Sequence, residues 1–305
     1  MTASIIQPGT LEPPAGGLPE LRLPERHLFE TRAARLEALA SGHALGDYLR
    51  FLAGVARAQH AALALVRGVL LPDAECLAQC REHGMPPLGT QGHTRSPLWR
   101  TVLRQILTEL AAGTLPAAAR ATIERLQQLD DASVERLADR LLAGDFAGLD
   151  RASAPFIAAA LQVYWLHMAT SLGSAAFAPL PTPHLCPVCG SEPVASVVRI
   201  GGTEQGLRYL QCSLCSAEWH VVRIKCAFCD TTKDISYYGI EGGNAAVKAE
   251  RCDHCDSYLK ILYMEKDPGV DAVADDVASV ALDVLMAESG VARGGLNYFL
   301  IGGDA

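Results

Sequence analysis

The chain has 305 residues, half of them hydrophobic, which is enough to bury a sizeable core in more than one domain. Its formal net charge is −8, and the region that holds eight of the ten cysteines, residues 184–266, carries nine basic and ten acidic side chains. A nucleic-acid-binding protein is expected to cluster Lys and Arg on one face, so this class of protein is disfavoured.

Residues 1–24 are rich in Pro and Gly and predict a disordered tail. No basic residue precedes Arg22, and five prolines interrupt any apolar run, so the segment does not have the pattern of an export signal. We therefore expect a reducing compartment, in which the cysteines are not joined as disulfides.

Residues 25–177 predict an all-α domain. Apolar side chains recur at helical spacing from Phe29, Ala33 and Leu36 onward, and nothing in this half alternates like a strand. Ser96-Pro97 is a typical helix start. Helices are expected from about residue 25, around 52–66, over 73–82, after 97, and near 116–129, 133–143 and 155–174.

The segment 156–177 has no charged residue over about one membrane thickness. However, Gln162, His167 and several small polar residues interrupt it, and alanine supplies much of its apolar character. We interpret it as a central helix buried on most sides, and we expect no insertion into a membrane.

Cys76 and Cys80 are separated by one helical turn and so lie on one face of the predicted helix 73–82. They could supply half of a metal site, but no partner pair is visible nearby. Because cysteine is among the residues most often buried, we expect both side chains to pack in the core.

A Pro-rich linker, 178–183, precedes four Cys-x-x-Cys knuckles. The first and second knuckles are separated by 22 residues, and so are the third and fourth. A tetrahedral ion takes four ligands, so each knuckle needs a second one from elsewhere in the chain. The repeat predicts two copies of one metal-binding module, over 184–222 and 223–266.

The 22-residue gaps suit β-hairpins. In the first module the β-branched run 194–200 leads to a turn at Gly201-Gly202 and a return strand at 207–210, and the second module repeats this plan over 235–250. Four such knuckles in hairpins favour tetrathiolate metal sites over disulfides or a thioredoxin-type redox pair.

Residues 216–225 contain no Gly, Pro, Asn or Asp and predict a strand that holds the second and third knuckles apart. This favours pairing the first knuckle with the second and the third with the fourth, although a crossed pairing stays open. The expected ligands are Cys186, Cys189, Cys212 and Cys215 in site 1, and Cys226, Cys229, Cys252 and Cys255 in site 2. Four thiolates suit either zinc or a mononuclear iron, so spacing leaves the metal open.

Residues 267–305 carry seven acidic side chains and one basic one. A final helix over 270–288 places valines 273, 277, 280 and 284 on one face, which we expect to pack back onto the protein. His184, His220 and His254 lie beside or within knuckles, where no further ligand is needed. No catalytic constellation and no Gly-rich phosphate loop is found. The fold class expected is an all-α N-terminal domain, two tandem rubredoxin-like or zinc-ribbon β modules, and a C-terminal helix.

The helical half, the Pro-rich joint, Cys-Pro-Val-Cys-Gly at 186–190 and three further knuckles at these separations resemble the formate dehydrogenase accessory protein FdhE family over about 25–305. The resemblance implies a cytoplasmic protein without enzymatic activity that binds the catalytic subunit of respiratory formate dehydrogenase. It also implies that this protein is needed for assembly of that subunit before export. The family's rubredoxin-like sites are associated with iron, so the resemblance favours two iron ions held by the eight knuckle cysteines, with zinc as the alternative.

Three functions follow as hypotheses. The first is a non-enzymatic assembly protein, and the second is a rubredoxin-like electron carrier acting on formate dehydrogenase, which requires iron. A nucleic-acid-binding ribbon protein is the third and is disfavoured by charge. A homodimer is compatible with the sequence, which does not identify the residues that bind the partner.

Overall fold

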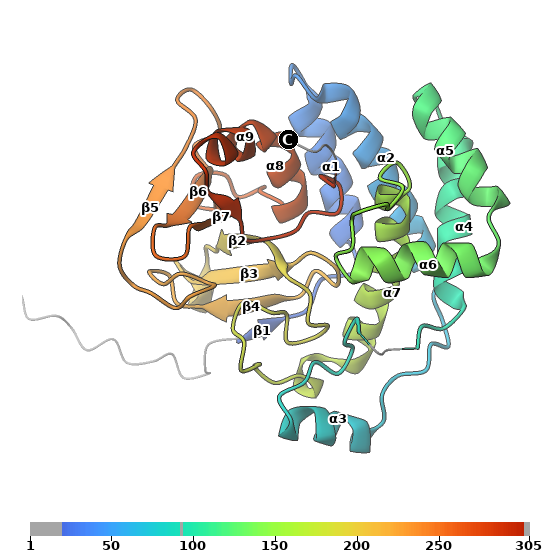
Figure 1. The fold of residues 1–305 in the computed structure, drawn as a ribbon, viewed down its shortest axis with the longest axis horizontal. Helices are drawn as coiled ribbons and strands as arrows, with labels where there is room; N and C mark the ends of the chain where they lie inside the picture. Colours follow the sequence, from blue (N-terminus) through green and yellow to red (C-terminus); the bar gives the residue numbers. More distant parts are fainter. Residues whose placement is uncertain (1–19, 92–93, 302–305) are drawn as a thin grey trace, which may run out of the picture.

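A computed structural model describes residues 20–91 and 94–301 of the chain. Figure 1 shows a helical half beside a twisted sheet, with two C-terminal helices lying over the sheet next to the first helix. This arrangement confirms the expected fold class, a helical N-terminal region followed by a sheet region with two four-cysteine clusters and helices at the end.

The helical half contains seven α-helices within the described residues and a 3-10 turn, Ser174–Ala176. Their bounds are α1 Leu28–Ala40, α2 Gly46–Leu63, α3 Ala74–Glu82, α4 Leu98–Ala111, α5 Ala117–Gln128, α6 Asp131–Leu142 and α7 Ala154–Leu172. They follow the periodicity of the sequence, because α7 is buried on most sides and each of the others except α3 buries one apolar face.

Helix α7 is the centre of this half. Most of its side chains are buried, including the polar Gln162, which accepts a hydrogen bond from Gln59 at 2.9 Å. No helix in the described parts of the chain is both long enough and apolar enough to cross a membrane. The apolar stretch is therefore a core helix, as its interrupting polar residues indicate.

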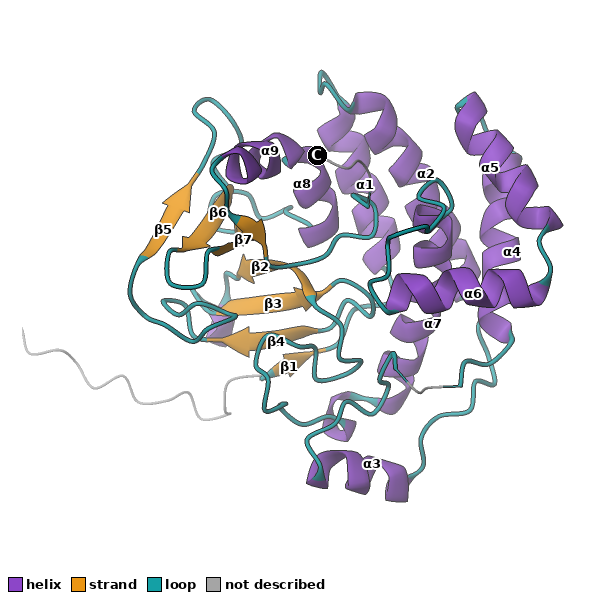
Figure 2. Ribbon diagram, viewed as in Figure 1, coloured by secondary structure: helices purple, strands orange, loops and turns teal. Residues whose placement is uncertain are grey.

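The strands form one eight-stranded sheet (Figure 2). Their bounds are β1 Leu21–Arg22, β2 Pro193–Val198, β3 Arg208–Cys212, β4 Glu218–Val221, β5 Ile235–Tyr238, β6 Val247–Cys252, β7 Ser257–Tyr263 and β8 Ala292–Arg293. The order is β1-β4-β3-β2-β7-β6-β5, and β8 pairs with β7. A 3-10 turn, Gly202–Glu204, connects β2 to β3.

The two cysteine modules are joined through the backbone. Hairpins β2–β3 and β5–β6 lie where the sequence predicts them, and β2 pairs in parallel with β7, with Ser196 opposite Ile261. All six residues of β2 are buried, since strands flank it on both edges and a C-terminal helix packs against it. Both modules therefore belong to one sheet.

The expectation of a disordered tail is wrong for its last residues. Leu21 pairs with Trp219 and Arg22 with Glu218, and the backbone N–H of His220 donates to Glu20 at 2.9 Å. Strand β1 thus adds to the edge of the sheet at β4. The rest of the expected tail, residues 1–19, lies outside the described residues.

The expectation of one long C-terminal helix is also wrong. The segment forms two helices, α8 Ala272–Ala278 and α9 Val280–Glu288, which are divided at Ser279. Val273 and Val277 are buried against α1 and β2, as expected, but Val284 is 53% exposed. The change of direction at Ser279 rotates the second half of the valine stripe away from the core.

Candidate metal centres

The structure brings the eight knuckle cysteines into two groups of four. Within each group the sulfur atoms all lie within 4.8 Å of one another. The first group is Cys186, Cys189, Cys212 and Cys215, and the second is Cys226, Cys229, Cys252 and Cys255. The first knuckle thus meets the second and the third meets the fourth, so the crossed arrangement does not occur.

The sulfur positions fit a tetrahedral ion. Four sulfurs at about 2.3 Å from a central metal lie roughly 3.8 Å from one another. In the first cluster, Cys189 Sγ lies 3.4 Å from Cys212 Sγ and 3.7 Å from Cys215 Sγ. In the second, the distance from Cys226 Sγ to Cys255 Sγ is 3.7 Å. Each cluster has both the donor set and the size that a thiolate-bound metal requires.

Each knuckle turns back in the same way. The residue that follows the second cysteine has a left-handed backbone, with φ of 73° at Gly190, 59° at Ser216, 65° at Asp230 and 50° at Asp256. This conformation lets the chain wrap around the sulfurs, as in the hydrogen bond from Gly190 N to Cys186 O at 2.8 Å. The sequence marked this turn only at the glycine, because the other three positions carry residues that adopt it less often.

Hydrogen bonds from the backbone to the sulfur atoms also favour metal binding. Backbone N–H groups of Leu214 and Cys215 donate to Cys212 Sγ at 3.3 and 3.4 Å, and Phe228 N donates to Cys226 Sγ at 3.4 Å. Such donors stabilise a thiolate over a neutral thiol. The knuckle backbone is therefore arranged for ionised cysteines.

The two clusters differ in exposure. All four cysteines of the first cluster are fully buried, at 0% exposure. In the second, Cys226 and Cys252 are buried but Cys229 and Cys255 are partly exposed. Solvent and solutes can reach the second cluster more readily than the first.

Burial and contact between the cysteines shift the pKa values of their thiols. Burial raises the pKa of Cys186 and Cys215 well above the usual range of a thiol, and it raises the pKa of Cys226 to about 12. Burial also opposes ionisation of Cys189, but hydrogen bonds from the other three thiols outweigh it and hold the pKa of Cys189 well below that range. A bound cation would allow all four groups to be thiolates, because it supplies the positive charge that burial otherwise denies them.

The helical half is hydrogen-bonded to the first cluster. A segment that we call the strap, residues 85–90, lies along the first knuckle: Leu88 N donates to Val188 O at 3.0 Å, and Thr90 N donates to Cys189 O at 3.2 Å. Trp165 of α7 in turn donates through Nε1 to Leu88 O at 2.8 Å. The first cluster is thus fixed to the core of the helical domain.

The second knuckle has its own link to that core. Gln162 of α7 donates through Nε2 to the backbone oxygen of Ser213 at 2.8 Å, inside the knuckle. The third knuckle instead contacts the first module, where the rings of His184 and Phe228 lie 5.4 Å apart. None of the three knuckle histidines joins a cluster, and His254 is exposed.

The expected burial of Cys76 and Cys80 is wrong. Cys76 is exposed and Cys80 is only partly buried, because α3 has no buried residue. The helix lies at the lower edge of the view in Figure 1, outside the bundle formed by the other helices. Residue type predicted burial here, but the helix that carries the cysteines does not pack into the core.

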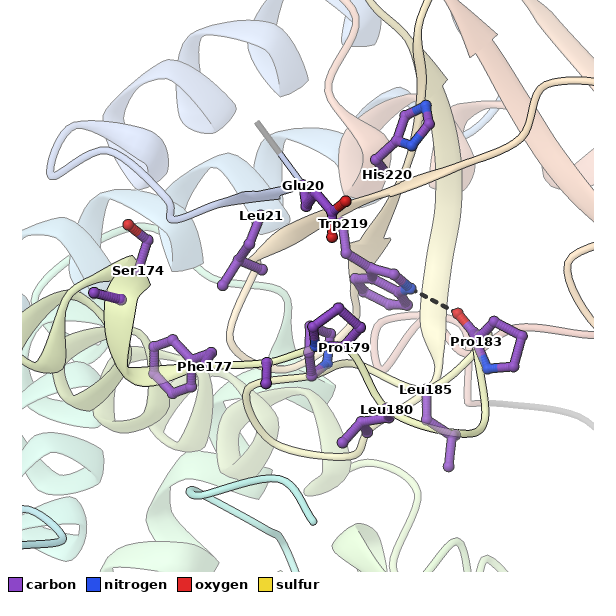
Figure 3. Close-up of a pocket in the computed structure, with 13 residues that line it drawn as sticks. Glu20, Leu21, Ser174, Phe177, Pro179, Leu180, Pro183, Leu185, Trp219 and His220 are labelled. Atoms are coloured by element: carbon purple, nitrogen blue, oxygen red, sulfur yellow. Dashed lines mark hydrogen bonds between the residues drawn. The ribbon is translucent and has the colours of Figure 1, made fainter. Parts of the chain in front are cut away.

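A pocket of about 540 Å³ lies beside the first cluster. The Pro-rich linker forms one side of it and β1 and β4 form the other, with Phe177, Leu180 and Trp219 facing inward (Figure 3). Trp219 Nε1 donates to Pro183 O at 2.8 Å, which holds the linker against the sheet. Sequence patterns did not predict this pocket, since its walls come from segments far apart in the chain.

Comparison with known proteins identifies the family. Three family models match in succession: FdhE, N-terminal over residues 18–182, FdhE, central domain over 185–223, and FdhE, C-terminal domain over 224–300. The chain belongs to the FdhE family. The resemblance seen in the sequence is thereby confirmed.

Individual FdhE proteins agree over nearly the whole length. The Protein FdhE homolog of Edwardsiella ictaluri is 48% identical over 95% of this chain and 94% of that protein. The homolog of Pseudomonas aeruginosa is 42% identical over 99% of both. The crystal structure of the FdhE protein from Pseudomonas aeruginosa superposes with a TM-score of 0.81 at 41% identity, covering 94% of this chain and 100% of that one.

Proposed function

We propose that the protein is a non-enzymatic assembly factor that binds the catalytic subunit of respiratory formate dehydrogenase in the cytoplasm, before that subunit is exported. The observation that carries this proposal is membership of the FdhE family over nearly the full chain. In support, the groups of three or more His, Cys, Asp or Glu with metal-ligand spacing in the described residues are the two four-cysteine clusters. Tetrathiolate sites of this kind leave no open position for a substrate.

The eight knuckle cysteines would hold one metal ion in each cluster. The family resemblance favours iron, and zinc is the alternative. Either ion would fix two knuckles and the hairpin between them, since metal binding supplies much of the folding free energy of such modules. Iron held by four thiolates would add the capacity to change oxidation state, which zinc does not have.

A second candidate, electron transfer to or from formate dehydrogenase, is favoured by the exposure of the second cluster. Cys229 and Cys255 are partly exposed, whereas the first cluster is fully enclosed. A one-electron carrier needs close approach of its partner, and only the second cluster allows it. In this scheme the metal in the first cluster would stabilise the fold, and the metal in the second cluster would carry the electron.

Complementation tests the proposal and separates the two candidates. The protein would be loaded with zinc in both clusters and introduced into cells that lack it, with the iron-loaded protein as the matched control. An assembly factor that only holds its client should bind the catalytic subunit and restore formate oxidation with either metal. Pull-down of the subunit and formate-dependent dye reduction measure the two steps.

Three outcomes have distinct meanings. If the folded, iron-loaded protein neither binds the subunit nor restores formate oxidation, the proposed function is wrong. If the zinc protein binds but restores nothing, a redox step through iron must be added. If both metals restore activity, the electron-transfer candidate is excluded.

A further inference from the structure

The two cysteines outside the clusters lie next to each other on the surface. Cys76 and Cys80 occupy one face of α3, and helix geometry places their Cα atoms about 6 Å apart. Partial burial and the neighbouring Cys76 thiol raise the pKa of Cys80. Because Cys76 is exposed, a small disulfide can reach its thiol, and Cys80 lies one helical turn away to complete an exchange.

The end of α3 is connected to the first metal centre. The backbone N–H of Met85, the first residue of the strap, donates to Cys80 O at 2.8 Å. Five residues later, Thr90 N donates to Cys189 O at 3.2 Å. A short, hydrogen-bonded segment therefore joins the last turn of α3 to a cysteine of the first cluster.

We propose that Cys76 and Cys80 form a redox-active dithiol that a low-molecular-weight disulfide oxidises to an intrachain disulfide. The thiolate of the exposed Cys76 attacks one sulfur of the small disulfide, forms a mixed disulfide and releases one small thiolate. Cys80 then loses its proton to solvent and attacks Cys76 Sγ, which releases the second small thiolate. The two protein thiols are oxidised by two electrons, and the small disulfide is reduced to two thiols.

Oxidation has to deform α3. Cβ atoms one helical turn apart lie about 5–6 Å from each other, whereas a disulfide holds them at about 3.8 Å. Because α3 buries none of its residues, its turn can distort at little cost to the core. The hydrogen bond from Met85 to Cys80 then shifts with the turn, and the strap loosens its hold on the first knuckle. This consequence rests on the metal binding proposed above, whereas the disulfide itself does not.

Thiol counting on the metal-loaded full-length protein tests the site. The protein is equilibrated in buffers of increasing oxidised-to-reduced glutathione ratio, alkylated and analysed by mass spectrometry. We expect the loss of both alkylatable thiols together and of two hydrogens in mass, with the bond located between Cys76 and Cys80. Cys76→Ser and Cys80→Ser are the matched controls, and each should form only a mixed disulfide with glutathione. Two glutathione adducts on the wild-type chain, or two thiols that stay reduced, would overturn the proposal.

Metal release tests the link to the first cluster. A chelator is added to reduced and oxidised wild-type protein and to the Cys76→Ser variant under both conditions. We expect one of the two ions to leave severalfold faster from the oxidised wild type, with no such change in the variant. If the disulfide forms and both ions leave at the rate of the reduced protein, the coupling through the strap is wrong and the dithiol stands. If the protein as purified binds no metal, the proposed metal centres fail, and the thiol count remains interpretable.

Discussion

Arg208 and Glu250 place opposite charges inside the sheet, at 0% and 5% side-chain exposure, with Arg208 Nη2 2.7 Å from Glu250 Oε1. Arg208 belongs to the first module and Glu250 to the second, and Arg208 Nη1 also donates to Lys225 O at 3.1 Å, directly before the third knuckle. Burial raises the pKa of Glu250, while Arg208 opposes that rise. The pair therefore links the two hairpins across the sheet, and each charge depends on the other for its compensation.

Replacing one partner of this pair should be costly. Arg208→Met leaves Glu250 buried without its counter-charge, and we expect a loss of about 3–5 kcal/mol in the free energy of unfolding. Arg251→Met is the matched control on β6, because the Arg251–Asp253 pair is partly exposed and should contribute about 0–1 kcal/mol. Urea unfolding of the metal-loaded proteins measures both values. Equal losses in the two variants would show that burial of the ion pair does not determine its contribution to stability.

The carboxylate of Asp271 has two roles at the start of helix α8. Asp271 Oδ1 accepts hydrogen bonds from Val273 N at 3.0 Å and Ala274 N at 2.8 Å, which caps the helix. The same side chain accepts from Arg32 Nε of α1 at 3.0 Å, and Arg32 is almost fully buried. The cap of one helix is thus the counter-ion of another, and this joins the C-terminal helices to the helical half.

Two substitutions at Asp271 separate these roles. Asp271→Ala removes the cap and leaves the Arg32 charge buried and unpaired, so we expect a loss of roughly 3–5 kcal/mol in the free energy of unfolding. Asp271→Asn keeps a good cap and removes only the charge. The difference between the two variants therefore measures the contribution of the cap to the free energy of unfolding, about 1 kcal/mol. Urea midpoints of both variants are compared with the wild type. A loss of only about 1 kcal/mol in Asp271→Ala would mean that the ion pair contributes little.

At the scale of the whole molecule, the grouping of the eight cysteines fixes how many ions each variant can hold. Loss of one thiolate should abolish metal binding by its own cluster, so a second substitution in that cluster should cause little further loss of metal. A substitution in the other cluster should remove the second ion. We expect Cys186→Ser/Cys215→Ser to retain one ion per chain and Cys186→Ser/Cys229→Ser to retain none. Elemental analysis of the purified variants checks this. The reverse result would mean that the metals pair the knuckles in the crossed order.

Local contacts explain what the sequence determined by itself. The knuckle spacing, the hairpins β2–β3 and β5–β6, and helices such as α4 and α7 are specified by residues that lie close together in the chain. Periodicity and turn-forming residues report those contacts directly, since side chains a few residues apart share one face. The grouping of the knuckles into two clusters followed in the same way from the matched gaps.

Contacts between distant segments decided the rest. A two-residue strand such as β1 is too short to show alternation, and it exists because Leu21 meets Trp219 at the edge of the sheet. The parallel pairing of Ser196 with Ile261, the break at Ser279 and the exposure of α3 likewise depend on which surfaces the assembled core leaves free. Periodicity shows which face of a segment is apolar, but only the tertiary structure decides whether another segment covers that face. That is why Cys76, which is exposed, and Cys80, which is only partly buried, had the sequence pattern of a buried pair.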